Sequence, residues 1–124
     1  MSKFKIRIGT RKSNLALWQA KTVANKLKEI GYESSIITLK SDGDINLTQP
    51  LYSFGIQGVF TKTLDSALLE KKIDIAVHSL KDVPTSLPSE IVLGGVLKRG
   101  NPFDIIIYNK KEGFQKNGFI GRSI

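Results

Sequence analysis

Apolar and polar positions along this chain follow two different periods, which predict strands and helices in turn. Apolar residues at every second position predict a strand over residues 4–9, and short apolar runs predict further strands over 34–39 and 73–78. Apolar residues three and four apart predict helices from about 15 to 30 and from about 60 to 71. This order predicts an α/β fold with a parallel or mixed sheet and helices on its faces.

Two residues predict where the first helix begins and ends. Ser13 stands directly before the apolar stripe, as an N-cap residue does, because its hydroxyl can accept a hydrogen bond from an unpaired backbone N–H. Gly31 follows the stripe and predicts the end of the helix.

The last third of the chain predicts two more strands and a possible domain boundary between them. The strands are expected over 91–97 and from 104 to 108, and the turn residues Arg99–Pro102 separate them. We expect a first domain over 1–99, followed by residues 100–124 as a crossover and the start of a second. An edge hairpin on a single domain fits the same residues.

Composition places the chain among soluble globular proteins. Apolar residues make up 40% and charged residues 24%, and no apolar run is long enough for a signal peptide or a membrane span. We therefore expect a cytoplasmic protein with no membrane partner. The absence of cysteine excludes disulfides and thiolate metal ligands, and the single histidine makes a zinc site implausible.

The net charge of +8 favours an anionic partner, although ordinary surface lysines scattered along the chain also explain most of the excess. Nucleic acid, phosphate and a polycarboxylate all satisfy that requirement. The lysines are spread along the chain, which argues against a nucleic-acid surface. A polycarboxylate would need only a few arginines in one cleft.

Polar residues directly follow the third predicted strand. His78, Ser79, Lys81 and Asp82 lie where this strand should leave the sheet, and Pro84 keeps the residue before it extended. Ligands of open α/β folds bind at the carboxyl ends of strands, so these groups are well placed for chemistry. A solvated loop at the end of a strand fits the same residues.

Three segments together resemble the signature of hydroxymethylbilane synthase, also called porphobilinogen deaminase. They are residues 6–20 (IRIGTRKSNLALWQA), 58–69 (GVFTKTLDSALL) and 74–88 (DIAVHSLKDVPTSLP). The resemblance runs over nearly the whole chain. It implies a lobe like those of the type II periplasmic binding proteins, with a mixed sheet, and the stub of a second lobe. Family members are considerably longer, so it also implies that this chain is a truncated N-terminal part.

The resemblance implies an enzyme of tetrapyrrole (heme) biosynthesis. Such transferases join four porphobilinogen units head to tail into hydroxymethylbilane and release ammonia at each step. Because each pyrrole carries two carboxylates and the reaction passes through a cationic azafulvene, the site needs fixed cations and a nearby carboxylate. By this resemblance Asp82 is the catalytic aspartate, which hydrogen-bonds the pyrrole N–H groups. Arg11 and Lys81 match residues that bind cofactor or substrate carboxylates, and Ser13 matches a hydroxyl donor in the same pocket.

Three further residues are candidates for binding substrate or cofactor. Gln19 lies about two turns into the first helix, on a face that looks either toward the site or toward solvent. Asp44 lies in a loop that resembles a Gly-Asp element of the family, although an ordinary Asx-type turn also explains it. Lys62 matches a lysine of the family pattern and lies in the first turn of the second helix, where a cation opposes the helix dipole.

The chain also departs from the family pattern. Gln57 stands where the family usually has lysine, and the family's paired arginines do not follow Ile120-Gly121. The cysteine that carries the family's dipyrromethane cofactor is absent as well. We therefore expect the chain by itself to be inactive. A non-catalytic module that binds a pyrrole dicarboxylate or another small anion is the alternative.

The family topology also predicts self-association. If the first lobe lacks a strand that returns from the second, its sheet has an unpaired edge and an exposed apolar patch. Residues 104–108 are then expected to pair with their own lobe or with a neighbouring chain.

Overall fold

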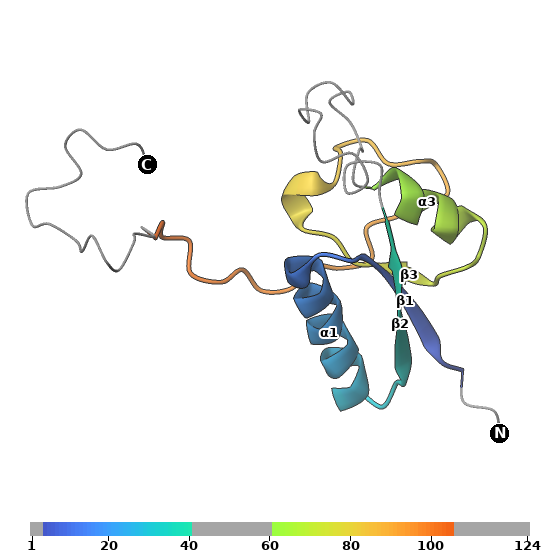
Figure 1. Ribbon diagram of the computed structural model, residues 1–124, viewed down its shortest axis with the longest axis horizontal. Coiled ribbons are helices and arrows are strands. Elements are labelled where there is room, and N and C mark those ends of the chain that lie inside the picture. The colour runs from blue at the N-terminus through green and yellow to red at the C-terminus, as the bar shows by residue number, and fades with distance from the viewer. Residues whose placement is uncertain (1–3, 41–60, 106–124) are drawn as a thin grey trace, which may run out of the picture. The chain divides into compact units, whose positions relative to one another are not determined.

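The computed structural model describes residues 4–40 and 61–105, and contacts divide the chain into two units, Met1–Leu93 and Gly94–Ile124. The described part of the first unit is an α/β arrangement (Figure 1). Its elements are β1 (Ile6–Arg11), α1 (Asn14–Glu29), β2 (Ser34–Leu39), α3 (Lys62–Leu69), β3 (Ile75–Ala76) and the 3-10 turn η2 (Leu80–Asp82). The α/β class predicted from the sequence is confirmed.

The strands form a parallel sheet in the order β2-β1-β3. The β1–β2 register runs from Ile6 opposite Ser34 to Arg11 opposite Leu39, and Ile8 of β1 also lies opposite Ile75 of β3. The sequence predicted a parallel or mixed sheet, and every pairing among the described residues is parallel.

Capping interactions fix both ends of α1, as the sequence predicted. The Ser13 hydroxyl accepts a hydrogen bond from the Ala16 N–H at 3.3 Å. At the other end, Gly31 lies at φ +92° and its N–H donates to the Lys28 carbonyl at 3.0 Å. This left-handed backbone is accessible to glycine because it has no Cβ.

The two helices cover opposite faces of the sheet. Thr10 of β1 is buried and its hydroxyl donates to the Ala16 carbonyl of α1 at 3.1 Å. Successive residues of a strand face opposite ways, so the adjacent Gly9 faces the other side. A Cβ at Gly9 would collide with Ile73 and would lie 3.1 Å from Leu64 Cδ2, on α3. The core on the α3 face is Leu64, Ala67 and Ile73, with Ile37, Leu39, Leu68 and Ala76 packed against it.

An ion pair joins the beginning of β3 to β1. Arg7 donates from Nε and Nη2 to the two carboxylate oxygens of Asp74, at 3.0 and 2.9 Å. The Arg7 backbone N–H adds a third bond to Asp74 at 2.8 Å. These hydrogen bonds from Arg7 hold the pKa of the Asp74 carboxyl below its usual value.

The predicted strands differ from the observed ones at their ends. The strand expected over residues 4–9 begins at Ile6, because β2 begins at Ser34 and offers residues 4–5 no partner. The strand expected over 73–78 is reduced to Ile75–Ala76, because the chain then leaves the sheet toward η2.

The strand predicted over residues 91–97 is wrong. These residues form no regular element, and Val92 is 81% exposed. A strand requires a neighbour that accepts its backbone hydrogen bonds, and the described residues place none beside this apolar run. The second unit is described over 94–105, where the Phe103 N–H donates to the Asn101 side chain at 2.9 Å. This bond makes a local turn at Asn101, within the residues expected to separate the strands, whereas 106–108 of the expected strand over 104–108 lie outside the described residues.

Candidate functional site

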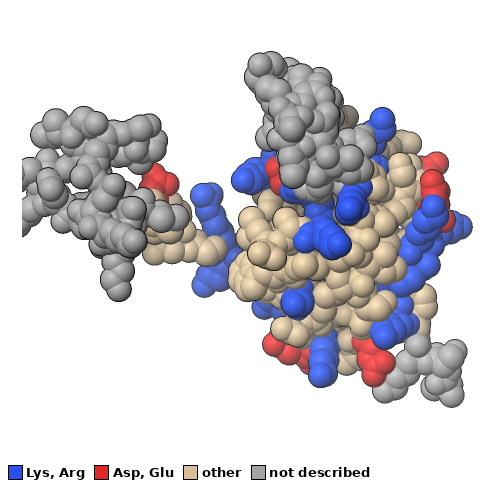
Figure 2. Space-filling view, in the orientation of Figure 1, with Lys and Arg blue, Asp and Glu red and all other residues tan. Residues whose placement is uncertain are grey.

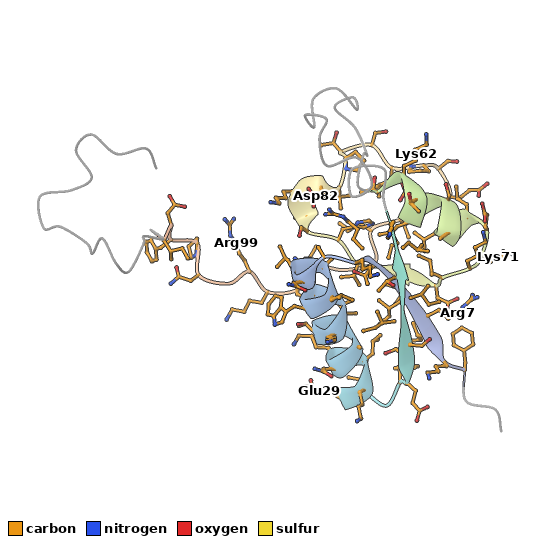
Figure 3. All side chains as sticks on the ribbon, viewed as in Figure 1. Arg7, Glu29, Lys62, Lys71, Asp82 and Arg99 are labelled. Carbon is orange, nitrogen blue, oxygen red and sulfur yellow. The ribbon has the colours of Figure 1, made fainter. Side chains whose placement is uncertain are left out.

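The carboxyl ends of β1 and β3 bring Arg11 and Asp82 together. Arg11 is the last residue of β1, and Asp82 belongs to η2, which follows β3. Arg11 Nη1 lies 4.0 Å from Asp82 Oδ2, and these side chains are only 19% and 20% exposed. Figure 3 shows Asp82 on the η2 turn, near the end of the sheet at which β1 stops. The family resemblance implied that Arg11 and Asp82 belong to one pocket, and the structure brings these two side chains together.

Backbone hydrogen bonds shape the turn that carries Asp82. The Asp82 N–H donates to the Ser79 carbonyl at 3.0 Å, and the Val83 N–H donates to the Leu80 carbonyl at 3.1 Å. Val83 then returns to an extended backbone, with φ −83° and ψ 122°. Pro84 requires this conformation of the residue before it and so limits η2 to a single turn. Lys81 lies exposed beside Asp82 on this turn.

Gln19 contacts the same turn through Ser79. Its amide Nε2 donates to Ser79 Oγ at 3.0 Å, and Ser79 Oγ donates to Gln19 Oε1 at 3.1 Å. Both side chains are partly buried. The structure thus directs Gln19 toward the site and not toward solvent.

Ser13 lies between Arg11 and the first turn of α1. Its hydroxyl oxygen accepts the bond that caps the helix, which leaves the O–H to donate to a ligand. Capping the helix and donating to a ligand are therefore compatible for this side chain.

His78 and Asp65 extend the group of charges around Asp82. His78 is partly buried, and burial lowers its pKa. The carboxylates of Asp65 and Asp82 act against this shift and raise the pKa, whereas the Arg11 cation lowers it further. Burial likewise raises the pKa of Asp65, and His78 opposes that shift. The structure therefore favours the neutral form of His78.

Lys62 lies at a neighbouring cavity and not beside the Arg11–Asp82 pair. The open cavity, of about 510 Å³, lies between α3 and residues 84–88, and Lys62 and Asp65 line it from α3. Neither Arg11 nor Asp82 is among its lining residues. Figure 3 shows Lys62 at the beginning of α3. Asp44 and Gln57 lie outside the described residues.

Sequence reasoning did not identify Ser79 as the partner of Gln19, or Asp65 as part of the site. Ser79 belongs to the polar run after β3, but nothing in that run indicates which residue it contacts. Asp65 follows Lys62 by three residues on α3, a spacing that places both on one helix face and was the available signal.

Three wider features complete the description. Figure 2 shows Lys and Arg side chains spread over the visible face instead of gathered in one patch. No three His, Cys, Asp or Glu side chains in the described ranges are grouped so that they could hold a metal ion. The helices of these ranges include none with the length and apolarity needed to cross a membrane.

Comparison with known proteins gives a match over most of the chain. The family model described as "Porphobilinogen deaminase, dipyromethane cofactor binding domain" matches residues 6–123. The chain is 50% identical over 115 residues to the probable porphobilinogen deaminase of Methanocaldococcus jannaschii, an alignment that covers 93% of this chain and 39% of the relative. It is 42% identical over 123 residues to the porphobilinogen deaminase of Rickettsia prowazekii, with 95% and 41% covered.

A third relative shows the same proportions. The porphobilinogen deaminase of Pelotomaculum thermopropionicum is 45% identical over 107 residues, which are 85% of this chain and 34% of the relative. The chain thus spans well under half the length of these relatives. Since the family model matches nearly all of its residues, the chain belongs to the porphobilinogen deaminase family.

Proposed function

We propose that this chain provides the catalytic aspartate and part of the carboxylate-binding site of a hydroxymethylbilane synthase. The reaction joins four porphobilinogen units head to tail and releases ammonia at each step. The observation that carries the proposal is the pairing of Arg11 with Asp82 where β1 and β3 end. The proposal includes the finer fold, in which the first unit is a lobe like those of type II periplasmic binding proteins.

Asp82 has the properties that the cationic stage of this reaction requires. Its side chain is four-fifths buried, so solvent screens its charge less than at an exposed site. Its 4.0 Å distance from Arg11 Nη1 exceeds a hydrogen bond, so this contact leaves its oxygens able to accept from pyrrole N–H groups. A carboxylate in that place stabilises the positive charge that develops as ammonia leaves.

Arg11, Lys81 and Ser13 account for the carboxylates of the substrate. Arg11 presents a planar guanidinium at the end of β1, and Lys81 adds a second cation on η2. A guanidinium binds a carboxylate through two parallel hydrogen bonds, whereas an ammonium acts as a point charge. The Ser13 hydroxyl is a neutral donor close to Arg11 in sequence.

The same residues fit a dipyrromethane, whose pyrroles also carry carboxylates. Arg11, Ser13 and Lys81 would hold these carboxylates, and Asp82 would accept from the pyrrole N–H groups. When bound, the group supplies the primer to which substrate units are added. The chain contains no cysteine, so its thioether attachment is not to any of these 124 residues.

A porphobilinogen titration of the purified chain tests this proposal. We expect saturable binding, measured by calorimetry, and no formation of hydroxymethylbilane. Arg11→Gln should weaken binding about tenfold or more, because it removes a charged hydrogen-bond donor. Lys28→Gln, in the last turn of α1, removes the same charge away from the site and should leave binding unchanged. Equal binding by the Arg11→Gln variant and the original chain would refute the proposal.

A second candidate is a module that binds a pyrrole dicarboxylate or another small anion without catalysis, for which the cations Arg11 and Lys81 would serve equally. The intact mass of the protein isolated from its source separates the two. A mass near 13.7 kDa favours the binding module, whereas a larger protein that carries a dipyrromethane favours the enzyme.

A further inference from the structure

The contact between Gln19 and Ser79 joins α1 to the loop after β3 across 60 positions of sequence. The Ser79 Oγ lies 3.0 Å from Nε2 and 3.1 Å from Oε1 of Gln19, so both ends of the amide reach one hydroxyl. Exchanging the amide nitrogen and oxygen leaves this contact intact. It is therefore independent of how the amide is oriented.

Ser79 contacts both Gln19 and Asp82. It occupies the N-cap position of η2, yet its side chain makes no capping hydrogen bond to the turn. Its hydroxyl is directed to Gln19 instead, while its backbone carbonyl accepts from the Asp82 N–H at 3.0 Å. Ser79 thus connects α1 to Asp82 through one side-chain contact and one backbone bond.

Two further contacts of the turn, among the described residues, are weak ones. Leu80 is 63% exposed, so the apolar side chain of η2 contributes little packing. Arg11 lies at the outer limit of an ion pair with Asp82, at 4.0 Å. A single 3-10 turn, closed here by two backbone hydrogen bonds, has little stability of its own.

We propose that Gln19 is a positioning residue that holds the Asp82 turn through Ser79. From its place on the helix, Gln19 was a candidate for direct binding of substrate or cofactor, with a solvated helix residue as the alternative. The proposal instead assigns it an action through a second side chain. The importance of Asp82 for the reaction rests on the proposed function. The mechanical link from Gln19 to Asp82 does not, and it can be measured without any ligand.

Hydrogen exchange of the Asp82 amide, followed by NMR in the whole chain, tests the link. Gln19→Leu and Ser79→Ala should each speed this exchange about fivefold, the effect of one ordinary hydrogen bond. The double variant should exchange no faster than either single variant, because all three lose the same contact. Gln19→Glu should stay near the original rate, since its carboxylate still accepts from the Ser79 hydroxyl.

Two controls separate this effect from general loosening. Asn25→Leu changes an exposed position of α1 and should leave Asp82 exchange unaltered. The Val77 N–H, which donates to the Gly9 carbonyl within the sheet, should keep its rate in every variant. Unchanged Asp82 exchange in Gln19→Leu, or additive effects in the double variant, would overturn the inference.

Porphobilinogen titration of the same variants distinguishes positioning from direct contact. If Gln19 acts through Ser79, Gln19→Leu and Ser79→Ala should weaken binding by the same factor. Weakening by Gln19→Leu alone would show a direct contact with the ligand and would overturn the inference. If the original chain binds no porphobilinogen, the proposed function fails, while the exchange rates still decide whether Gln19 positions Asp82.

Discussion

Gly9 shows how strictly the packing between β1 and α3 constrains one residue. It lies opposite Ala76 in the sheet, and added side-chain atoms would meet Ile73 and Leu64. We predict that Gly9→Ala lowers the free energy of unfolding by about 1–3 kcal/mol, because well-packed interiors do not absorb an extra methyl group. Denaturant unfolding of the variant measures this. Gly94→Ala is the matched control, since no atom lies within 4 Å of its added Cβ, and equal effects of the two substitutions would contradict the prediction.

His78 makes stability depend on pH. Burial lowers its pKa in the folded chain below the value of about 6.5 found for an unfolded one. Between the pKa of His78 in the folded chain and its pKa in the unfolded chain, the unfolded chain binds more protons than the folded one. The free energy of unfolding therefore falls as pH falls below about 6.5. We predict that His78→Gln loses less stability than the original chain between pH 7.5 and pH 5. Parallel pH dependences of the two melting temperatures would show that His78 is not responsible.

Sequence reasoning reached some residues of the site and not others, for a physical reason. The family resemblance implied that Arg11 and Asp82 share a pocket, and they meet because the parallel strands β1 and β3 end at the same edge of the sheet. The Gln19–Ser79 contact depends on how α1 is rotated against the sheet, and helical periodicity fixes that angle too coarsely to choose a partner. The placement of Lys62 at a separate cavity likewise depends on the path of residues 84–88.

At the scale of elements, the two helices end in the same backbone geometry with different residues. Gly31 after α1 lies at φ +92°, and Lys71 after α3 lies at φ +58°. The Lys71 N–H donates to Leu68 and the Lys72 N–H donates to Ala67, so the left-handed residue completes the last turn of α3.

Lys71 is therefore a site where glycine should stabilise the chain. A left-handed backbone is unfavourable for a residue with a Cβ by about 1–2 kcal/mol, and the greater freedom of glycine in the unfolded chain offsets part of the gain. We predict that Lys71→Gly raises the free energy of unfolding by up to about 1 kcal/mol and that Gly31→Ala lowers it by a similar amount. Thermal unfolding measures both. Lys72→Gly is the control, and stabilisation by it as well would point to the removed charge and not to the backbone.

Local signals predicted an element well when the residue that ends it has a distinctive chemistry. Ser13 and Gly31 marked both ends of α1. The end of α3 carried no such mark, because lysine gives no sign of a left-handed backbone. The apolar run over 91–97 resembles a strand in composition, but a strand also needs a partner, and a local pattern carries no information about partners.

At the scale of the whole molecule, the parallel sheet accounts for the position of the site. With α1 on one face and α3 on the other, β1 and β3 finish at the same end of the sheet, and Arg11 and Asp82 meet there. The net charge of +8 adds a long-range attraction for a dicarboxylate, which salt should weaken.

The sheet and the apolar run after residue 90 also predict self-association. Among the described residues no strand pairs with the outer edge of β2 or β3, and Val92 and Leu93 are 81% and 62% exposed. Open edges and exposed apolar side chains both favour contact between chains. Repulsion between chains of charge +8 opposes that contact at low ionic strength.

We therefore predict reversible association that strengthens with both concentration and salt, measured by sedimentation equilibrium. Replacing Val92 and Leu93 by lysine should weaken it by removing apolar contact. Replacing Thr85 and Ser89, which are both exposed, by lysine adds the same two charges at another place. This control should weaken association less. Salt separates the two contributions, because screening removes the effect of added charge but does not restore lost apolar surface. A strictly monomeric chain at high salt, or equal effects of the two double substitutions there, would contradict association through this apolar pair.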